Sequence, residues 1–210
     1  MKKLLGIIIL VVLVILVLKG FSKNNTSSTP LPRNELQQDA AYQGDLELED
    51  GDYTVATEKS SLVWSGKTPL RSHTGTVDVK DGNLLIVNGT LTGSVVFDMN
   101  SITSDSSAVD NDLKSKNFFE VETYPTAFLD IEGYTGGNIE GYLTIKGVTQ
   151  PVSLPVSIIA HNDTVTLSGK VSIDRTLWGV EYRSGSVFSG LGDKAIDDDI
   201  NLDVTIIATH

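Results

Sequence analysis

The sequence predicts an all-β domain, an antiparallel sandwich or barrel, on three observations. From Gly51 onward, apolar and polar residues alternate with a period of two, as in TVDVKDGNLLIVNG at 76–89. Turn-forming residues such as Asp81-Gly82-Asn83 and Asn88-Gly89 predict hairpin turns and interrupt the runs at intervals of about 8–12 residues. The runs amount to about eight or nine candidate strands in about 160 residues, which is typical of antiparallel sandwiches and barrels.

The candidate strands follow one another with few helical interruptions. Alternating runs occupy 52–67, 73–102, 126–134, 138–148, 151–173 and 200–210. Short helices are expected around Ser104–Lys116 and Gly192–Asp198. Each strand should carry one apolar and one polar face, and both Phe128 and Ile131 are assigned to an apolar face. A barrel of about eight strands is either filled by side chains or holds one small ligand, and the sequence leaves both open.

The first 50 residues have a different composition. Two Lys precede an uncharged, strongly apolar run from Leu4 to Leu18, which as a helix is about 22 Å long, short of a hydrocarbon core of about 30 Å. Residues 1–23 are therefore expected to be an uncleaved membrane anchor or a signal peptide. Both alternatives export the rest of the chain. Residues 24–50 are polar and contain Pro, which predicts a flexible tether that reaches on the order of 30 Å.

Charge and cysteine usage exclude several classes of function. The formal net charge is −11, and residues 51–210 carry 11 Lys and Arg against 21 Asp and Glu, a net charge of −10. Because such a domain is repelled by phosphate backbones, nucleic acid is not an expected partner. The sequence contains no Cys, so disulfides, thiol catalysis and a lipidated Cys are excluded.

The sequence offers little material for catalysis or metal binding. It has three His and no HxH or HExxH motif, so no metal site is expected. It also lacks a G-x-S-x-G elbow and a phosphate-binding loop, and no cofactor is expected. The acidic run Asp197–Asp199 lacks calcium-loop spacing and predicts a solvated turn. A hydrolase or isomerase that uses His73 is kept as an alternative, against a plain polar residue at a strand start.

Two further features allow a structural and a functional interpretation. Arg175 follows a predicted strand, and it is either a surface residue paired with an acid or a cation at a cavity mouth that holds a polar or anionic head group. Phe118 and Phe119 stand side by side before Pro125 in a polar segment. They are expected not to project the same way, with at least one inserted between helix and sheet. The pair either plugs the end of a filled core or gates an apolar channel.

Four ordered motifs resemble the YceI-like lipid/polyisoprenoid-binding family. The most specific are LKSKNFFEVETYPTAFL at 113–129 and EGYLTIKGVTQPVSLPV at 140–156. SSLVWSGKTPLRSHTGTV at 60–77 resembles the first hairpin of the family, and IDRTLWGVEY at 173–182 resembles a late element. Together the matches span about 52–210. The N-terminal segment and the short acidic stretch DSSAVDNDL at 105–113 depart from the family pattern.

The resemblance implies an eight-stranded antiparallel lipocalin-like barrel at 51–210 with a short helix against it. It also implies an apolar channel that holds an isoprenoid or a similar long-chain amphiphile, without catalysis and outside the cytoplasmic membrane. A structural or interaction module with a filled core is the main alternative. The residues expected to line the channel, gate it or contact a head group are Trp64, Phe97, Phe118, Phe119, Phe128, Leu143, Ile145, Trp178, His73 and Arg175.

Overall fold

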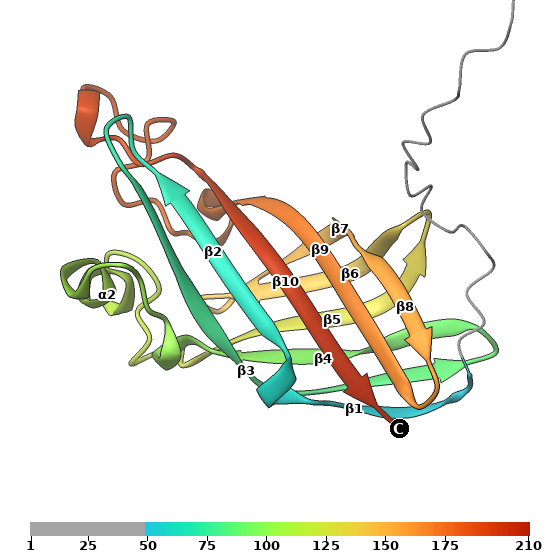
Figure 1. Cartoon of the computed structure of the whole chain (residues 1–210). Coiled ribbons are helices and arrows are strands. Elements are labelled where there is room, and N and C mark those ends of the chain that lie inside the picture. Colours follow the sequence, from blue (N-terminus) through green and yellow to red (C-terminus); the bar gives the residue numbers. More distant parts are fainter. Residues whose placement is uncertain (1–48) are drawn as a thin grey trace, which may run out of the picture. The chain divides into compact units, whose positions relative to one another are not determined.

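The computed structural model describes residues 49–210, which form ten β-strands, one α-helix and several short 3-10 helices (Figure 1). The predicted anchor or signal peptide at 1–23 and almost all of the predicted tether at 24–50 lie outside these residues. The α-helix is α2 (Ser107–Lys114), within the region where a helix was predicted. The strands are β1 (Gly51–Val55), β2 (Ser61–Lys67), β3 (Ser72–Val87), β4 (Thr90–Asp98), β5 (Thr126–Thr135), β6 (Asn138–Ile145), β7 (Val148–Pro155), β8 (Ser157–His161), β9 (Thr164–Asp174) and β10 (Asp199–Thr209).

The strands form one antiparallel sheet that curls into a barrel. Its order is β7-β6-β5-β4-β3-β1-β10-β9-β8, and β2 also pairs with β3 and β10. The two ends of this order, β7 and β8, are consecutive in the chain and separated only by Val156. The barrel is thereby closed, with β7 paired to β6 and β8 paired to β9.

The predicted number of eight strands is wrong, because two positions around the barrel each hold an interrupted strand. Both β1 and β2 lie between β3 and β10, and the 3-10 helix η2 (Thr57–Lys59) separates them. At this break the side chain of Ser60 replaces a backbone partner of β10, since its Oγ accepts a hydrogen bond of 3.0 Å from the Ile207 N–H. At the other break, between β7 and β8, Pro155 has no N–H to donate, and the Val156 N–H donates to the Gly137 carbonyl at 2.9 Å. Ten strands therefore occupy eight positions.

One of the two hairpin turns predicted in the β3–β4 region is absent. Asp81-Gly82-Asn83 lies within β3, which continues unbroken to Val87, and the register between β3 and β4 shifts between Val79 and Asp81. This irregularity is a β-bulge, and it lies where β3 exchanges its partner β2 for β1. The prediction of a turn at Asn88-Gly89 is confirmed, because both residues have left-handed backbones, with φ of 51° and 73°.

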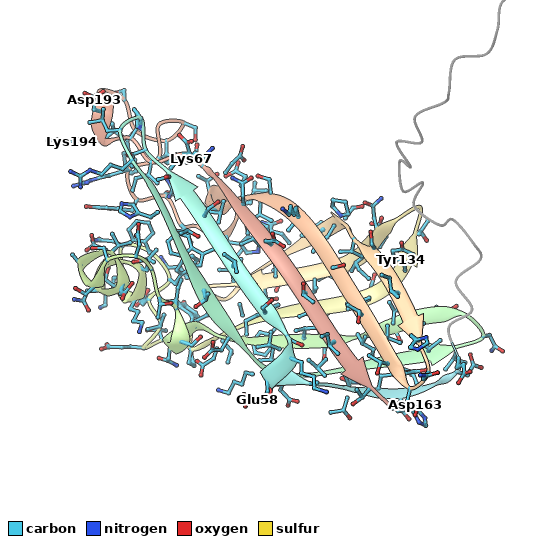
Figure 2. All side chains as sticks on the ribbon, viewed as in Figure 1. Glu58, Lys67, Tyr134, Asp163, Asp193 and Lys194 are labelled. Atoms are coloured by element: carbon cyan, nitrogen blue, oxygen red, sulfur yellow. The ribbon has the colours of Figure 1, made fainter. Side chains whose placement is uncertain are left out.

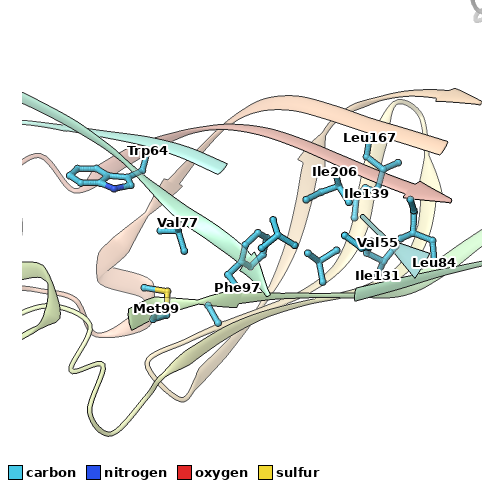
Figure 3. Close-up of a cluster of buried hydrophobic side chains, with 14 of the residues drawn as sticks. Val55, Trp64, Val77, Leu84, Phe97, Met99, Ile131, Ile139, Leu167 and Ile206 are labelled. Carbon is cyan, nitrogen blue, oxygen red and sulfur yellow. The ribbon is translucent and has the colours of Figure 1, made fainter. Parts of the chain in front are cut away.

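One end of the barrel is filled by tightly packed aliphatic side chains. Leu84 and Ile86 of β3 and Val95 of β4 are fully buried, with no exposed surface, and Val165 of β9 is 1% exposed. Figure 3 shows Val55, Leu84, Ile131 and Ile139 gathered at this end, away from Trp64 and Met99. Since burying each such side chain is worth about 1.5–3 kcal/mol, this closed end holds the strands together.

The opposite end carries α2 and the long connection between β9 and β10 (Figure 1). After β4 the chain crosses β3 at Gly75, on the face of β3 that also carries Val77 and lines the barrel interior. There the Thr103 N–H donates to the Thr76 carbonyl at 3.0 Å, and the Asp105 N–H donates to the Thr74 carbonyl at 3.1 Å. A Cβ on Gly75 would lie 1.8 Å from the Thr103 carbonyl oxygen, so this crossing requires glycine.

We expect Gly75→Ala to lower the free energy of unfolding by at least about 1–3 kcal/mol, because the added methyl group forces the backbone at Thr103 away from β3. Urea denaturation measures this change. The matched control is Gly133→Ala on β5, where a Cβ meets nothing within 4 Å. Equal stability of the two variants would show that the crossing segment is not held against β3.

Candidate functional site

Beyond the closed end, the barrel encloses a cavity of about 420 Å³. Its walls are made mainly by inward-facing aliphatic and aromatic side chains of the strands. The charged lining residues lie toward one end, where Lys67, Asp193 and Lys194 are close together (Figure 2). Asp163 marks the opposite, closed end in the same view. The cavity therefore has an apolar interior and a polar mouth.

The cavity is long enough for an extended chain. On β6 its lining runs from Ile139 to Ile145, which is about 20 Å along the strand and about 15 Å along the barrel axis once strand tilt is included. An apolar cavity of about 150 Å³ accommodates benzene, so the volume here suits on the order of 15 carbon atoms. Most of the lining residues are aliphatic or aromatic, so the arrangement suits hydrocarbon.

Both tryptophans of the chain border the cavity with their polar edges satisfied elsewhere. The Trp64 Nε1–H donates to the Thr103 carbonyl at 3.0 Å, and the Trp178 Nε1–H donates to the Leu143 carbonyl at 2.8 Å. They are 8% and 2% exposed. Because each N–H is used by the chain, each indole ring is held as an apolar wall. Phe97, Leu143 and Ile145 line the cavity as the sequence predicts.

Phe118 and Phe119 also line the cavity, and both are buried. The expectation that they project differently is wrong. Successive tight turns bring both inward, since the Phe118 N–H donates to the Ser115 carbonyl and the Phe119 N–H to the Leu113 carbonyl, at 3.1 and 3.0 Å. Phe118 meets Tyr182 edge-to-face, with 5.3 Å between ring centroids. This contact joins the segment after α2 to the β9–β10 connection at the mouth.

A family model for the YceI-like domain matches residues 53–208. The chain belongs to the YceI-like domain family. The resemblance noted in the sequence is thus confirmed. No curated protein matches the chain.

Two solved structures share the fold of this YceI-like domain. BcnA of Burkholderia cenocepacia is 21% identical, with a TM-score of 0.61, and the match covers 74% of this chain and 99% of BcnA. A polyisoprenoid-binding domain of Saccharophagus degradans is 13% identical, with a TM-score of 0.59, and the match covers 75% of this chain and 97% of that domain. At these identities the likeness establishes the barrel fold.

Phe128 is the one predicted lining residue that the YceI-like barrel places elsewhere. It is 39% exposed and does not border the cavity. Its neighbours Ala127, Leu129 and Ile131 point inward, so the alternation of β5 turns Phe128 outward. The assignment of Phe128 and Ile131 to one apolar face is wrong, because residues three positions apart on a strand point to opposite faces. The odd-numbered apolar residues of this strand carried the correct signal.

Arg175 borders the cavity, but its guanidinium is hydrogen-bonded to backbone carbonyl groups of the β9–β10 connection. Its Nε–H donates to the Asp197 carbonyl at 3.0 Å and its Nη2 to the Ile196 carbonyl at 3.0 Å, while Nη1 donates to the Val180 carbonyl. Asp198 Oδ1 lies 3.4 Å from Nη2. Burial lowers the pKa of Arg175, and the Asp198 charge opposes this effect. These contacts fasten the two ends of the β9–β10 connection together; contact with a head group stays a prediction.

Asp198 makes the stability contributed by these Arg175 contacts dependent on pH. Burial alone raises the pKa of Asp198, but hydrogen bonds from Ser184 and Ser186 and the charge of Arg175 outweigh it and hold the pKa below its usual value. Since the unfolded value is about 3.9, the ionised carboxylate stabilises the fold. This stabilisation is complete above about pH 5 and is lost as the pH falls through the folded-state pKa.

We therefore expect the destabilisation caused by Asp198→Asn to be largest near pH 6 and to shrink toward pH 3, as measured by urea denaturation at each pH. Asp203→Asn is the control, because its pair with Lys170 is solvent-exposed and contributes little. A penalty for Asp198→Asn that stays constant from pH 6 to pH 3 would contradict the role of the ionised carboxylate.

His73 lies at the edge of the mouth, one residue after the start of β3. Its Nδ1 is 2.8 Å from Asp105 Oδ1, and no hydroxyl group in residues 49–210 is hydrogen-bonded to the ring. The pair joins β3 to the segment that leads into α2. Within the described chain, no group of three or more His, Cys, Asp or Glu is placed to hold a metal ion, and no helix has the length and apolarity to cross a bilayer.

Sequence reasoning missed the residues that close and surround the mouth. Tyr182, Arg183, Lys67 and Lys194 all line it. The IDRTLWGVEY motif ended at Tyr182, but nothing in the local pattern indicated that its ring would meet Phe118, more than 60 residues earlier. Only the closure of the barrel brings these residues together.

Proposed function

We propose that this YceI-like domain binds an isoprenoid or a similar long-chain amphiphile in its cavity, without catalysis and outside the cytoplasmic membrane. The observation that carries the proposal is the elongated apolar cavity of about 420 Å³, closed at one end and open at a polar mouth. Burying each CH₂ of a chain is worth about 0.8 kcal/mol, so a chain of on the order of 15 carbons offers ample driving force for firm binding. The polyisoprenoid-binding domain that shares the fold supports the choice of ligand.

The cavity also weighs against the alternative of an interaction module with a filled core. A barrel of this size would need additional large side chains to fill about 420 Å³ at ordinary packing density. The third alternative, a hydrolase built on His73, has an acid partner in Asp105 but no aligned nucleophile within residues 49–210.

The binding proposal is tested on the full chain, purified in mild detergent from the cells that make it. Native mass spectrometry should show an adduct, and organic extraction followed by mass spectrometry should identify a prenyl or other long-chain lipid in near-equimolar amount. Protein that is empty after purification and fails to take up added prenyl lipid would overturn the proposal.

The location of the domain needs a separate test. We propose that residues 1–23 direct the barrel across the cytoplasmic membrane, as an anchor or as a cleaved signal. Because the chain has no Cys, a single Asp163→Cys at an exposed turn allows labelling with a membrane-impermeant maleimide in spheroplasts. Labelling without lysis supports an exported barrel, whereas labelling only after lysis would overturn it. The intact mass of the same protein reports whether residues 1–23 remain attached.

A further inference from the structure

Three cations surround the mouth where the apolar lining ends. Lys67 ends β2, and Arg183 and Lys194 belong to the β9–β10 connection. The ion pairs found in residues 49–210 join His73 to Asp105, Lys170 to Asp203 and Arg175 to Asp198, so none of the three cations has a carboxylate within 4 Å there. We propose that Arg183, assisted by Lys67 and Lys194, binds an anionic head group of the lipid whose chain occupies the cavity. This inference rests on the function proposed above.

Arg183 lies at the boundary between apolar and charged surroundings. Its guanidinium carbon is 5.0 Å from the centroid of the Tyr182 ring, and that ring meets Phe118 edge-to-face. A chain under Phe118 and Tyr182 would therefore bring its head group to the guanidinium. A planar guanidinium binds phosphate or carboxylate oxygens in pairs, so it suits an anionic head group.

The backbone holds Arg183 in an unusual conformation. Its φ is 52°, in the left-handed region that side-chain-bearing residues rarely adopt, and its carbonyl accepts a 2.8 Å hydrogen bond from the Ile196 N–H. The neighbouring Asp197 N–H donates to the Lys67 carbonyl at 2.9 Å, which joins β2 to the same connection. These backbone contacts hold Arg183 at the mouth, close to the end of β2.

The other charged groups at the mouth do not remove this site. The lining contains three acids, Asp112, Asp193 and Asp197, so the mouth is close to neutral while residues 51–210 carry −10. The two residues that the sequence proposed for a head group are already engaged: Arg175 by three carbonyls and Asp198, and His73 by Asp105. Arg183 is an exposed residue that borders the cavity.

The test uses two probes with the same 15-carbon chain, neutral farnesol and anionic farnesyl diphosphate. Quenching of Trp64 and Trp178, the two tryptophans of the chain, reports occupancy of the cavity. With the full chain in zwitterionic nanodiscs at 0.1 M salt, we expect the diphosphate to bind at least tenfold more tightly. Arg183→Gln should remove most of this preference, because it weakens the binding of farnesyl diphosphate much more than the binding of farnesol. Arg71→Gln, an exposed residue outside the lining, is the matched control.

The outcomes separate this inference from the proposed function. Equal affinity of the wild type for both probes would overturn the head-group site and leave lipid binding intact, whereas binding of neither probe would overturn both. A variant that loses both probes while its melting temperature is unchanged would also count against a head-group role. Should Arg183→Gln unfold the domain, Lys67→Gln with Lys194→Gln tests the same preference, and an unaltered preference there would overturn the site.

Discussion

Ala127→Trp should abolish lipid binding. Ala127 is 5% exposed, lines the cavity from β5 and pairs with Phe97 of β4. An indole ring at this position enters the cavity and occupies the space needed by the chain. We expect a loss of at least a hundredfold in affinity for farnesol, because the ring replaces several buried CH₂ groups at about 0.8 kcal/mol each. Native mass spectrometry should correspondingly find the purified variant empty.

Phe128→Trp is the matched control, since the same side chain is introduced one residue further along the same strand. Phe128 faces outward and is 39% exposed, so this variant should bind farnesol like the wild type. Stability is compared in both, because an inserted ring costs typically 1–3 kcal/mol even in a tolerant core. Undiminished binding by a folded Ala127→Trp variant would mean that the ligand lies elsewhere.

Arg175→Met should strongly destabilise the domain. The guanidinium satisfies carbonyl groups of Asp197, Val180 and Ile196 and pairs with Asp198. Met keeps much of the apolar volume but leaves these groups and a partly buried carboxylate without their partner. Removing one partner of a buried ion pair costs about 3–5 kcal/mol, which corresponds to a fall in melting temperature of roughly 6–20 °C for a domain of this size.

Arg71→Met provides the comparison for a cation without such contacts, because Arg71 is exposed in the β2–β3 loop. It should change the melting temperature by no more than about 1–2 °C. Calorimetry of both variants checks the expectation. If Arg175→Met keeps the wild-type melting temperature but loses only the preference for farnesyl diphosphate, then Arg175 contacts the head group after all.

Most of the barrel strands could be predicted from the alternation of apolar and polar residues and from the turn-forming residues between the alternating runs. Alternation marks which side chains face inward wherever a strand has a single apolar parity, as at Val165 and Leu167 of β9. It fails in TAFLDIEGY, where Ala127, Phe128 and Leu129 are all apolar and both parities look acceptable. The prediction of a turn fails at Asp81-Gly82-Asn83. These residue types are as common in a β-bulge as in a turn, and β3 contains a bulge here.

The functional residues at the mouth were less predictable. An Arg after a strand is compatible with a head-group site and with a clamp, and the distinction depends on which carbonyls lie within 3 Å of it. For Arg175 those carbonyls come from residues 5 to 22 positions later in the chain. Arg183 has no sequence signal at all, because its role depends on the ring of Tyr182 and, through it, on Phe118.

Local chemistry therefore accounts for the β class, the antiparallel connections and the family, since each depends on residues close together in the chain. The internal cavity cannot be predicted from residues that are close together in the chain. It depends on the radius of a closed barrel relative to the summed volume of the side chains that enter it, and closure requires β7 and β8 to continue each other across Val156. The cavity of about 420 Å³ and the cations at its mouth are consequences of that closure.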